Sequence, residues 1–494
     1  MKKYILSRLI KSIFAILVVV AIVVVILYRL VPTYKVFESD DTYRKLKGNN
    51  KTQYTYKKLE ELGYLDYMTM SEMAKKYANG NTQALDPKSD AAKEGLSFAK
   101  SDGYTVQLLD KNDELRGQYI AYKYYNVVQL IGKFFSRMVV IDSPGKIQDE
   151  NNPDLKRGYS IAKDMNAVPA LVCSGCKYKY QIYFNSSFPF IHQNFFKLYF
   201  GESYPTFSGL NTLDVIGGGQ GTMKKFEQTF PTGQKSKSAI LQHSASYKYE
   251  LDHLDKKRFD DHYADTKNKY ESPSMIGTSF IFGVFSIIFA YAFALPAGIS
   301  MARNKGKWQD RLGIVYINLL IAVPSLAFIF FMRYLGSFLG MPDKFPLLGF
   351  KSIKSFIMPI IILGLMSTPS LMMWIRRYMV DQQNADYVKF AKAKGLSQKE
   401  ISKNHILKNA IIPIVNGIPM SIILAISGAV ITESLFAIPG MGKMLPDAIK
   451  TANNNMVITI TFIFTTLSVL SVFVGDLLMT FVDPRISLNV KEDE

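Results

Sequence analysis

Several motifs that carry enzyme chemistry are missing from this chain of 494 residues. It contains no G-K-[ST] sequence, so it lacks the lysine and the hydroxyl that hold the phosphates and magnesium of a bound nucleotide. H-E-x-x-H and G-x-S-x-G are absent as well, which argues against a zinc protease and a serine hydrolase. The chemistries that these motifs carry are therefore not expected, and we identify no catalytic residues.

Cysteine and histidine are also scarce, with two and five residues. Cys173 and Cys176 form a single C-x-x-C, which could close a small disulfide, act in redox exchange or remain as free thiols. No second C-x-x-C or H-x-x-x-H completes a zinc site. His253 and His262 lie among aspartates, but interleaved lysines disfavour a cation there. We expect no metal site and a solvated loop.

Long apolar segments dominate the second half of the chain and recur near its start. Each is close to the ~20 residues that a helix needs to cross ~30 Å of hydrocarbon. The first follows a short basic start, but VPTYKVF comes after it instead of a small-residue cleavage site, so we expect an uncleaved anchor. The sequence predicts six spans at about 9–31, 274–302, 312–340, 355–375, 409–432 and 456–481.

Lysine and arginine near the span ends predict the orientation. The N-terminus, the loop 303–311, the stretch 376–408 and the C-terminal tail hold 18 basic residues, against six on the opposite side. Both termini are therefore predicted to be cytoplasmic and residues 32–273 extracellular. The net charge of +18 follows this topology, so nucleic-acid binding is not expected.

Residues 32–273 are too long and too aromatic for a linker. Strand-like runs at 104–109 and 177–185 and a helical pattern over 124–139 predict a compact α+β domain. Residues 38–95 are polar and predicted to be largely helical. Two loop-like stretches, at 217–222 and 252–265, precede the second span.

The basic stretch between Arg376 and Pro413 is the most informative part of the chain. Apolar residues at helical spacing are followed by Gly395, a helix stop, and then by Ser397 and Glu400, which form an S-x-x-E capping box. Two short helices joined by a rigid elbow, residues 387–407, are predicted. From these residues alone, an ordinary basic loop is an equally good interpretation.

Ionisable residues are few within the apolar segments. Arg333, Glu433 and Asp476 fall near predicted interfaces, where their side chains can reach water. A proton-coupled carrier would need a carboxylate near the midplane of the membrane, and none is evident. Five prolines, which kink helices and free carbonyl groups, lie inside apolar segments: Pro296, Pro324, Pro359, Pro369 and Pro419.

The stretch DYVKFAKAKGLSQKEISKNHILKNAIIP resembles the cytoplasmic "EAA" loop of ABC importer permeases, specifically of the B-type subunit of oligopeptide and dipeptide permeases. FAIPGMGKMLPDAI at 436–449, GDLLMTFVDPRI at 475–486 and the segment 189–216 are similar to other parts of that family. Residues 36–188 and 217–273 have no counterpart in its shorter members. Such enlarged domains resemble those of Gram-positive oligopeptide permeases.

The resemblance implies an all-α polytopic membrane protein with six transmembrane helices of the type I ABC importer permease fold. An α+β extracellular domain would be inserted between helices 1 and 2. The expected domains are residues 1–31 (cytoplasmic end and helix 1), 32–273 (extracellular domain), 274–482 (helices 2–6, with the coupling loop 376–408) and 483–494 (cytoplasmic tail).

The resemblance also implies partners. They are a second homologous permease subunit, two ATPase subunits that bind ATP and Mg, an extracellular peptide-binding lipoprotein, and the lipid bilayer of the cell membrane. This chain itself would hold no cofactor. ATPase coupling is assigned by resemblance to Tyr387, Phe390, Ala391, Ala393, Gly395, Leu396, Ser397, Glu400, His405, Asn409 and Pro413, and a signature outer loop to Pro439, Gly440 and Gly442.

The expected function is the ATP-driven import of oligopeptides. A dipeptide- or nickel-type importer permease is the alternative within the family. An ABC mechanotransmitter or exporter subunit with a large extracellular domain is the alternative from another class, although that type usually has four spans and no helix–glycine–helix loop. The residues that contact substrate are not predicted.

Overall fold

The computed structural model describes residues 2–80, 85–86, 88–109, 118–145, 156–163, 167–176, 178–184, 191–229, 235–238, 240–242, 266–268 and 270–482. The chain divides into two compact units. The helical unit comprises Met1–Val20, Ser272–Asp447 and Ile460–Glu494, and the mixed unit comprises Ala21–Glu271 and Ala448–Thr459. Two long helices, α1 (Lys2–Leu30) and α18 (Asn454–Val482), contribute residues to both units.

One division between the units, after residue 271, lies within two residues of the predicted boundary at 273. The first division falls at residue 20 instead of 31, and residues 448–459 join the mixed unit although they lie far along the sequence. The predicted extracellular and cytoplasmic domains remain predictions. Residues 483–494, the predicted tail, lie outside the described residues.

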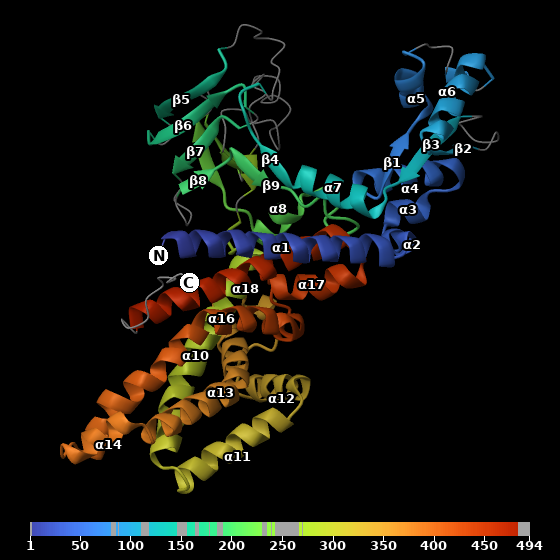
Figure 1. Ribbon diagram of the computed structural model, residues 1–494. Helices are drawn as coiled ribbons and strands as arrows, with labels where there is room; N and C mark the ends of the chain where they lie inside the picture. The colour runs from blue at the N-terminus through green and yellow to red at the C-terminus, as the bar shows by residue number, and fades with distance from the viewer. Residues whose placement is uncertain are drawn as a thin grey trace. The chain divides into compact units, whose positions relative to one another are not determined.

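The helical unit is built from long apolar helices joined by short turns (Figure 1). In the part of the chain that the structure describes, five helices are long and apolar enough to cross a membrane, and they coincide with five of the six predicted spans. Besides α1 and α18, the unit contains α10 (Met275–Arg303), α11 (Trp308–Ala322), α12 (Ser325–Phe338), α13 (Lys354–Gln383), α14 (Asp386–Ala393), α15 (Gln398–Glu400), the π-helical turn η4 (Ile401–Ile406), α16 (Leu407–Phe436) and α17 (Met441–Lys450). Two 3₁₀ turns, η2 (Phe345–Leu347) and η3 (Gly349–Lys351), precede α13.

The predicted span at 312–340 is wrong as a single helix. The chain forms α11 and α12 there, and the two are bent by 106° at the break between them. Pro324 is the N-cap of α12. A proline has no N–H to donate and disfavours the helical conformation in the residue before it, and here α11 ends at Ala322. The other predicted prolines lie inside continuous helices: Pro296, Pro359, Pro369 and Pro419. The pair α11–α12 is either one broken span or a re-entrant loop.

Small residues allow the helices of this unit to approach closely. A Cβ atom added at Gly298 of α10 would lie 2.8 Å from the side chain of Ile375 of α13. One added at Gly364 of α13 would lie 2.5 Å from Phe289 and 2.9 Å from the carbonyl oxygen of Ser286. Because burial of apolar surface does not drive helices together in lipid, such close backbone packing is a main source of their association.

The mixed unit contains two β-sheet lobes connected by α7 (Val127–Met138), as Figure 1 shows. The first lobe has an antiparallel sheet of order β1-β3-β2, formed by Leu65–Met68, Tyr119–Tyr124 and Thr105–Leu108. Its helices are α2 (Thr33–Phe37), α3 (Asp41–Lys45), α4 (Gly48–Glu61), α5 (Met70–Tyr77) and α6 (Asp90–Ser101). The helices predicted within 38–95 correspond to α3 to α6 of this lobe, and the strand predicted at 104–109 corresponds to β2.

The second lobe has an antiparallel sheet of order β5-β6-β7-β8, formed by Gly158–Lys163, Pro169–Ser174, Tyr180–Phe184 and Ile191–Gln193. A short ribbon pairs β4 (Val139–Ile141) with β9 (Phe196–Leu198). The loop predicted at 217–222 starts at the end of α8 (Thr212–Gly217). Beyond it lie β10 (Phe226–Thr229), β11 (Lys235–Ser238), β12 (Ile240–Gln242) and β13 (Thr266–Asn268), while the predicted loop 252–265, with His253 and His262, lies outside the described residues.

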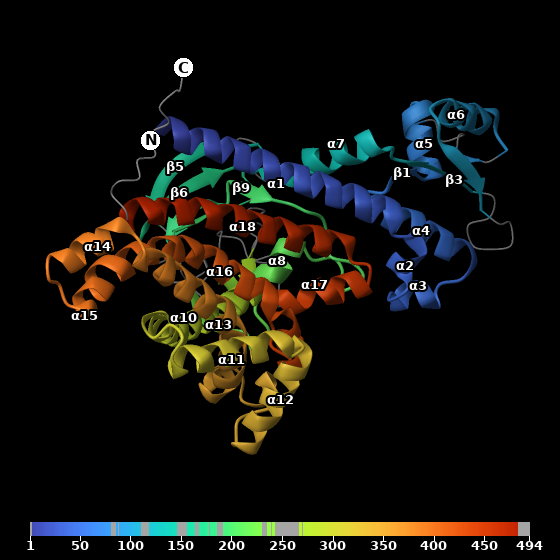
Figure 2. The same ribbon diagram turned by 60° about the horizontal axis from the view of Figure 1, so that its bottom comes forward.

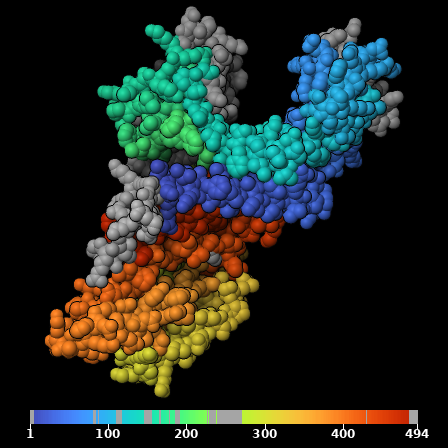
Figure 3. Space-filling model, viewed as in Figure 1, coloured from blue at the N-terminus to red at the C-terminus, as the bar shows by residue number. Residues whose placement is uncertain are grey.

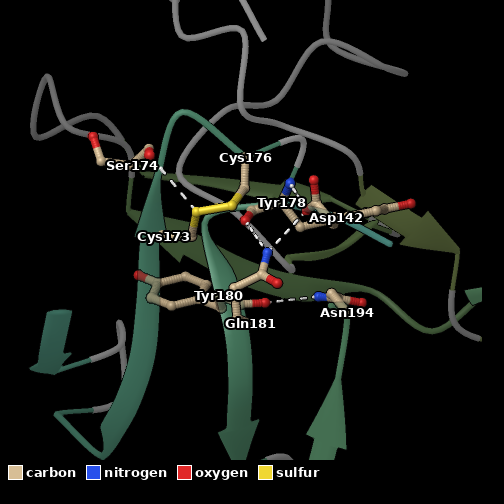
Figure 4. Close-up of a disulfide and its surroundings, with 8 residues drawn as sticks. All are labelled: Asp142, Cys173, Ser174, Cys176, Tyr178, Tyr180, Gln181 and Asn194. Carbon is tan, nitrogen blue, oxygen red and sulfur yellow. Dashed lines mark hydrogen bonds between the residues drawn. A yellow bond between two sulfur atoms is a disulfide. The ribbon is translucent and has the colours of Figure 1, made fainter. Parts of the chain in front are cut away.

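Cys173 and Cys176 form a disulfide at the end of β6, one of the outcomes that the sequence leaves open (Figure 4). Beside it, the buried Asp142 accepts hydrogen bonds of 2.9 Å from the backbone N–H of Tyr178 and from the Gln181 amide. The Gln181 amide also donates to the carbonyl of Tyr178, at 2.7 Å. The disulfide thus closes a tight turn beside a buried carboxylate that is hydrogen-bonded within the lobe, while Oε1 of Gln181 has no hydrogen-bond partner among the residues that the structure describes.

Three consecutive buried asparagines fix the start of α18 within the mixed unit. Asn453 donates to Ser203 Oγ at 2.8 Å, and Asn454 donates to the hydroxyl of Tyr64 at 2.5 Å. Asn455 donates to the carbonyl of Glu202 at 2.9 Å and accepts from the Tyr28 hydroxyl at 2.8 Å. The three amides therefore join the start of α18 to α1, to the residue before β1 and to the segment at 202–203.

Asp40, also buried, links α3, α4 and a later loop. Its carboxylate accepts hydrogen bonds from the hydroxyls of Tyr54, at 2.6 Å, and Tyr204, and from the backbone N–H groups of Thr42 and Tyr43. Burial raises the pKa of Asp40, but these four hydrogen bonds together outweigh it and hold the pKa below its ordinary value. The ionised form is thus the one that the folded protein stabilises.

Asp40→Asn should lower the free energy of unfolding of the mixed unit by about 1–3 kcal/mol at pH 7, because a charged acceptor is lost. A carboxyl whose folded pKa is lowered stabilises the fold above about pH 4 and loses that contribution as the pH falls through the lowered value. The variant should therefore lose less stability than the wild type between pH 5 and pH 2.

Thermal melts followed by near-UV circular dichroism, which reports tyrosine packing, measure both effects. Asp41→Asn is the matched control, since the neighbouring Asp41 side chain is 83% exposed. Equal acid sensitivity of the wild type and Asp40→Asn would contradict the assignment.

Candidate functional site

Within the elbow, residues 387–407, the first helix, α14, ends at a defined stop. Gly395 has a φ of +78°, which an L-residue rarely adopts. Its N–H donates to the carbonyl of Lys392 at 3.0 Å, and the N–H of Leu396 donates to the carbonyl of Ala391 at 3.3 Å. These two bonds form a Schellman motif, which satisfies the last carbonyls of the helix.

The next helix starts two residues later with the predicted capping box. Ser397 Oγ accepts from the N–H of Glu400 at 3.3 Å, and the Glu400 carboxylate accepts from the N–H of Ser397 at 2.9 Å. This helix is not short as predicted, since α15, η4 and α16 continue one another from Gln398 to Phe436. The elbow is therefore a direct extension of a candidate membrane span.

Apolar residues pack the elbow against the helical unit. Val388 and Ala391 of α14 and Ile401 and Ile406 of η4 are buried. They share one core cluster with residues of α10, α13 and α16, such as Met301, Ile375, Met379, Ala410 and Ile414. Because protein cores are close-packed and transmit strain, a displacement of α14 must move these helices too.

Polar contacts attach the same region at three further points. Arg303 at the end of α10 donates from Nε to Ser402 Oγ of η4 at 2.7 Å. Gln383 at the end of α13 donates to the carbonyl of Ala302 at 3.0 Å. The buried Asp310 accepts two hydrogen bonds from Arg376, of 2.6 and 2.9 Å, in a bidentate pair that joins α11 to α13.

The outer surface of the elbow is exposed without interruption from residue 392 to residue 400. It is basic, and it carries large apolar side chains that are exposed to solvent: Phe390 is 69% exposed and Leu396 is 37% exposed. In both ribbon views α14 lies at the end of the long helices (Figure 2). An exposed aromatic side chain beside a stiff turn is a feature of protein-binding surfaces.

The residues assigned to coupling occupy three different environments. Those on the exposed surface are Phe390, Ala393, Gly395, Leu396, Ser397 and Glu400. Ala391 instead faces the core, so its small side chain serves packing within the unit. Tyr387, His405, Asn409 and Pro413 are partly buried, and the Tyr387 hydroxyl donates to Gln382 at 2.6 Å.

The predicted position of Glu433 near water is wrong. This residue of α16 is fully buried, and its carboxylate accepts from Ser279 Oγ at 2.6 Å and from the N–H of Lys443 at 2.9 Å. The signature loop wraps around it. A Cβ atom at Gly440 would lie 2.4 Å from the carboxyl group and one at Gly442 would lie 2.9 Å from Oε2, while Pro439 precedes this turn.

Sequence reasoning missed the residues that hold both parts of the site. Asp310, Arg376, Ser402 and Ser279 carry no motif, although a charged residue at the edge of an apolar segment calls for a partner. Their partners lie 66 to 154 residues away, so spacing alone could not identify them. Among the residues that the structure describes, no group of three or more His, Cys, Asp or Glu side chains could hold a metal ion.

The long apolar helices of the described residues, with the capped elbow at their end, are those of a multi-pass membrane protein. Residues 294–488 match the family model described as the inner membrane component of binding-protein-dependent transport systems. The oligopeptide transport system permease AmiC of Streptococcus pneumoniae is 40% identical over 99% of both chains. The chain belongs to this family of ABC transporter permeases.

Shorter relatives match the helical part. The dipeptide permease DppB of Lactococcus lactis subsp. cremoris is 31% identical over 42% of this chain and 67% of its own. The oligopeptide permease OppB of Mycoplasma genitalium is 34% identical over 37% of this chain and 47% of its own. An inward-facing structure of the methionine transporter MetNI covers 42% of this chain and 94% of its own, with 15% identity and a TM-score of 0.36, a likeness too low to define the fold.

Gly440→Ala should destabilise the helical unit by about 1–3 kcal/mol, because the added methyl group would overlap the buried Glu433 carboxylate. Gly417→Ala in α16 is the control, since a Cβ atom there meets nothing within 4 Å and alanine favours the helix by about 1 kcal/mol. Thermal stability of the two purified variants in one detergent gives the comparison. Equal melting temperatures would show that the loop does not close on Glu433.

Proposed function

We propose that this chain is the permease subunit of an ATP-driven importer of oligopeptides. The observation that carries the proposal is the elbow, an exposed and capped turn whose apolar residues pack into the core of the helical unit. The chain has no G-K-[ST] nucleotide-binding motif of its own, so a partner must supply the ATPase activity. The similarity to AmiC covers 99% of both chains, including the large insertion, and supports oligopeptides over dipeptides as cargo.

The proposed assembly contains this chain, a second homologous permease subunit, two ATPase subunits and an extracellular peptide-binding lipoprotein. Both termini lie in the cytoplasm and residues 32–273 lie outside. The bent pair α11–α12 then counts as the sixth span, since an even number of spans places both termini on one side. The positive-inside rule supports this orientation.

In this mechanism the exposed surface of the elbow sits in a groove of one ATPase. Closure of the ATPases pushes α14, and the packed contacts at Val388, Ala391 and Ile401 pass that displacement to α10, α13 and α16. The helices then change between inward- and outward-facing arrangements as rigid bodies. A compliant loop would absorb the movement, which explains the Schellman motif and the capping box.

Co-purification from native membranes, followed by mass spectrometry, tests the assembly. Two ATPase subunits, a second permease and a peptide-binding lipoprotein are expected with this chain, together with bound peptides of mixed sequence. Recovery without any ATPase would overturn the proposal, and recovery of dipeptides or nickel alone would assign a different cargo.

Gly395→Val is expected to abolish peptide uptake while ATP hydrolysis continues, because a β-branched residue cannot adopt the φ of +78° that the elbow requires. Lys394→Glu, next to Leu396 on the exposed surface, should reduce coupling in the same way through charge. Peptide transported per ATP hydrolysed, measured in proteoliposomes, gives the result.

Gly340→Val is the matched control for this substitution. Gly340 has a φ of +77° and follows α12 with the same pair of hydrogen bonds, from the N–H groups of Met341 and Gly340. It therefore carries a similar backbone strain at a different helix end. Normal uptake by Gly395→Val, or equal loss in both variants, would contradict a coupling role for the elbow.

A further inference from the structure

A cleft of about 480 Å³ lies in the mixed unit where α7 meets the first sheet lobe. Figure 3 shows the face of this unit that is hollowed above α7 (cyan), beside the lobe of α5 and α6 (blue). The volume falls within the range of about 300–1,000 Å³ that is common for sites of small ligands. The cleft is lined by Asp66, Tyr104, Lys123, Tyr125, Gln129, Gly132, Lys133 and Ser136.

One wall of the cleft is a single face of α7. Gln129, Gly132, Lys133 and Ser136 follow the spacing i, i+3, i+4 and i+7, so they lie in one row along the helix. This row is polar and exposed, with a glycine at its centre. A Cβ atom added at Gly132 would meet nothing within 4 Å, so the space in front of the helix is open.

The opposite wall is partly buried and already organised. The Tyr104 hydroxyl donates to Asp66 at 2.5 Å, and Lys123 donates to the carbonyl of Asp102 at 2.5 Å. The Lys123 ammonium also lies 5.6 Å from the centre of the Tyr104 ring. A fixed carboxylate, a fixed ammonium and an aromatic ring therefore lie on this wall before any ligand is present.

The two lysines have no carboxylate partner among the residues that the structure describes. Lys133 lies 5.4 Å from the centre of the Tyr125 ring, a cation–π contact that leaves its N–H groups free to donate. Lys123 has two further N–H groups besides the one that binds Asp102. One cleft thus holds two unpaired cations, one anion and two aromatic rings.

We propose that this cleft binds the carboxyl-terminal end of a short peptide. The free carboxylate pairs with Lys133 and Lys123, which form charge-assisted hydrogen bonds. Gln129 and Ser136 offer amide and hydroxyl groups to the peptide backbone, and the partly buried ring of Tyr125 contacts an apolar side chain. The site would give the permease chain a peptide contact of its own, apart from the binding lipoprotein and the membrane pathway.

Peptide is chosen over other anions because the cleft offers more than charge. An inorganic anion would use the lysines and leave the Tyr125 ring and the polar row of α7 without a role. A short peptide with an apolar terminal residue matches the cations, the Tyr125 ring and the amide-binding row together. This choice of ligand rests on the proposed function, since peptide is the proposed cargo.

Binding to the full chain in lipid nanodiscs, without ATPase or lipoprotein, tests the site. The probes are a tetrapeptide of alanine and phenylalanine with a free carboxylate, the same peptide as its C-terminal amide, and inorganic phosphate as a competitor. The free acid should bind at least about tenfold more tightly than the amide, since a charge-assisted pair is lost on amidation. Phosphate should compete weakly.

Two pairs of variants make the result specific. Lys133→Met should weaken binding of the free acid about tenfold and leave binding of the amide unchanged, because both changes remove the same ion pair. Lys75→Met, an exposed lysine of α5 outside the cleft, should change neither. Gly132→Leu should abolish binding by filling the open space, whereas Gly132→Ala should retain it.

Equal affinity for acid and amide, full binding by Gly132→Leu, or displacement by phosphate as effective as by peptide would each overturn the proposal. These measurements do not involve transport. If uptake in the whole transporter fails while this binding persists, the proposed function is wrong and the cleft is still a peptide-binding site. If uptake occurs and this binding is absent, only the cleft proposal is wrong.

Discussion

The helical unit depends on one constraint: a backbone polar group in hydrocarbon must find its partner inside the protein. Helices meet this requirement by themselves, so the chain is helical wherever it is apolar. The break between α11 and α12 is tolerable because the N–H of Val323 still donates to Leu319, and proline at position 324 has no N–H to satisfy. The same requirement explains why the buried Glu433 is wrapped by backbone N–H and hydroxyl donors.

The elbow is a stiff turn. A turn between two helices is usually the most compliant part of a bundle, since its backbone is exposed and its contacts are few. Here the turn is closed on both sides by capping hydrogen bonds and is rooted in the core by four apolar side chains. The exposed residues can therefore vary with a partner's surface, while the buried ones determine whether a push is transmitted.

Much of this structure was predictable because the signals were local. The hydrophobic runs predict the five long helices. Gly395, Ser397 and Glu400 predict the end of α14 and the capping box of the next helix at the correct residues. The failures involve long-range contacts. The sequence around Glu433 does not predict its hydrogen bond with Ser279, and the sequence around Asp310 does not predict its ion pair with Arg376. Ala391 is assigned to coupling by resemblance, and the structure places its side chain in the core; its coupling role stays a prediction.

The bend at Pro324 could not be told from the sequence alone. Four other prolines also follow apolar residues at helical spacing, yet their helices continue through them: Pro296, Pro359, Pro369 and Pro419. Of these five, only at Pro324 does a new helix begin after the proline. Hydropathy alone cannot distinguish one long helix from two short ones, because the same apolar residues give the same hydropathy in either arrangement. The mixed unit was harder, since its strands are short and its partners are distant in sequence.

The asparagines at 453–455 have a consequence for the modularity of the chain. A domain inserted between two helices is expected to be removable, because its two ends are close and its core is its own. Here the last helix begins with three amides whose hydrogen-bond partners come from residues 28, 64, 202 and 203. The start of α18 is therefore tied to α1 and to residues 64 and 202–203 of the predicted insertion, and removal of the insertion would leave buried amides without hydrogen-bond partners.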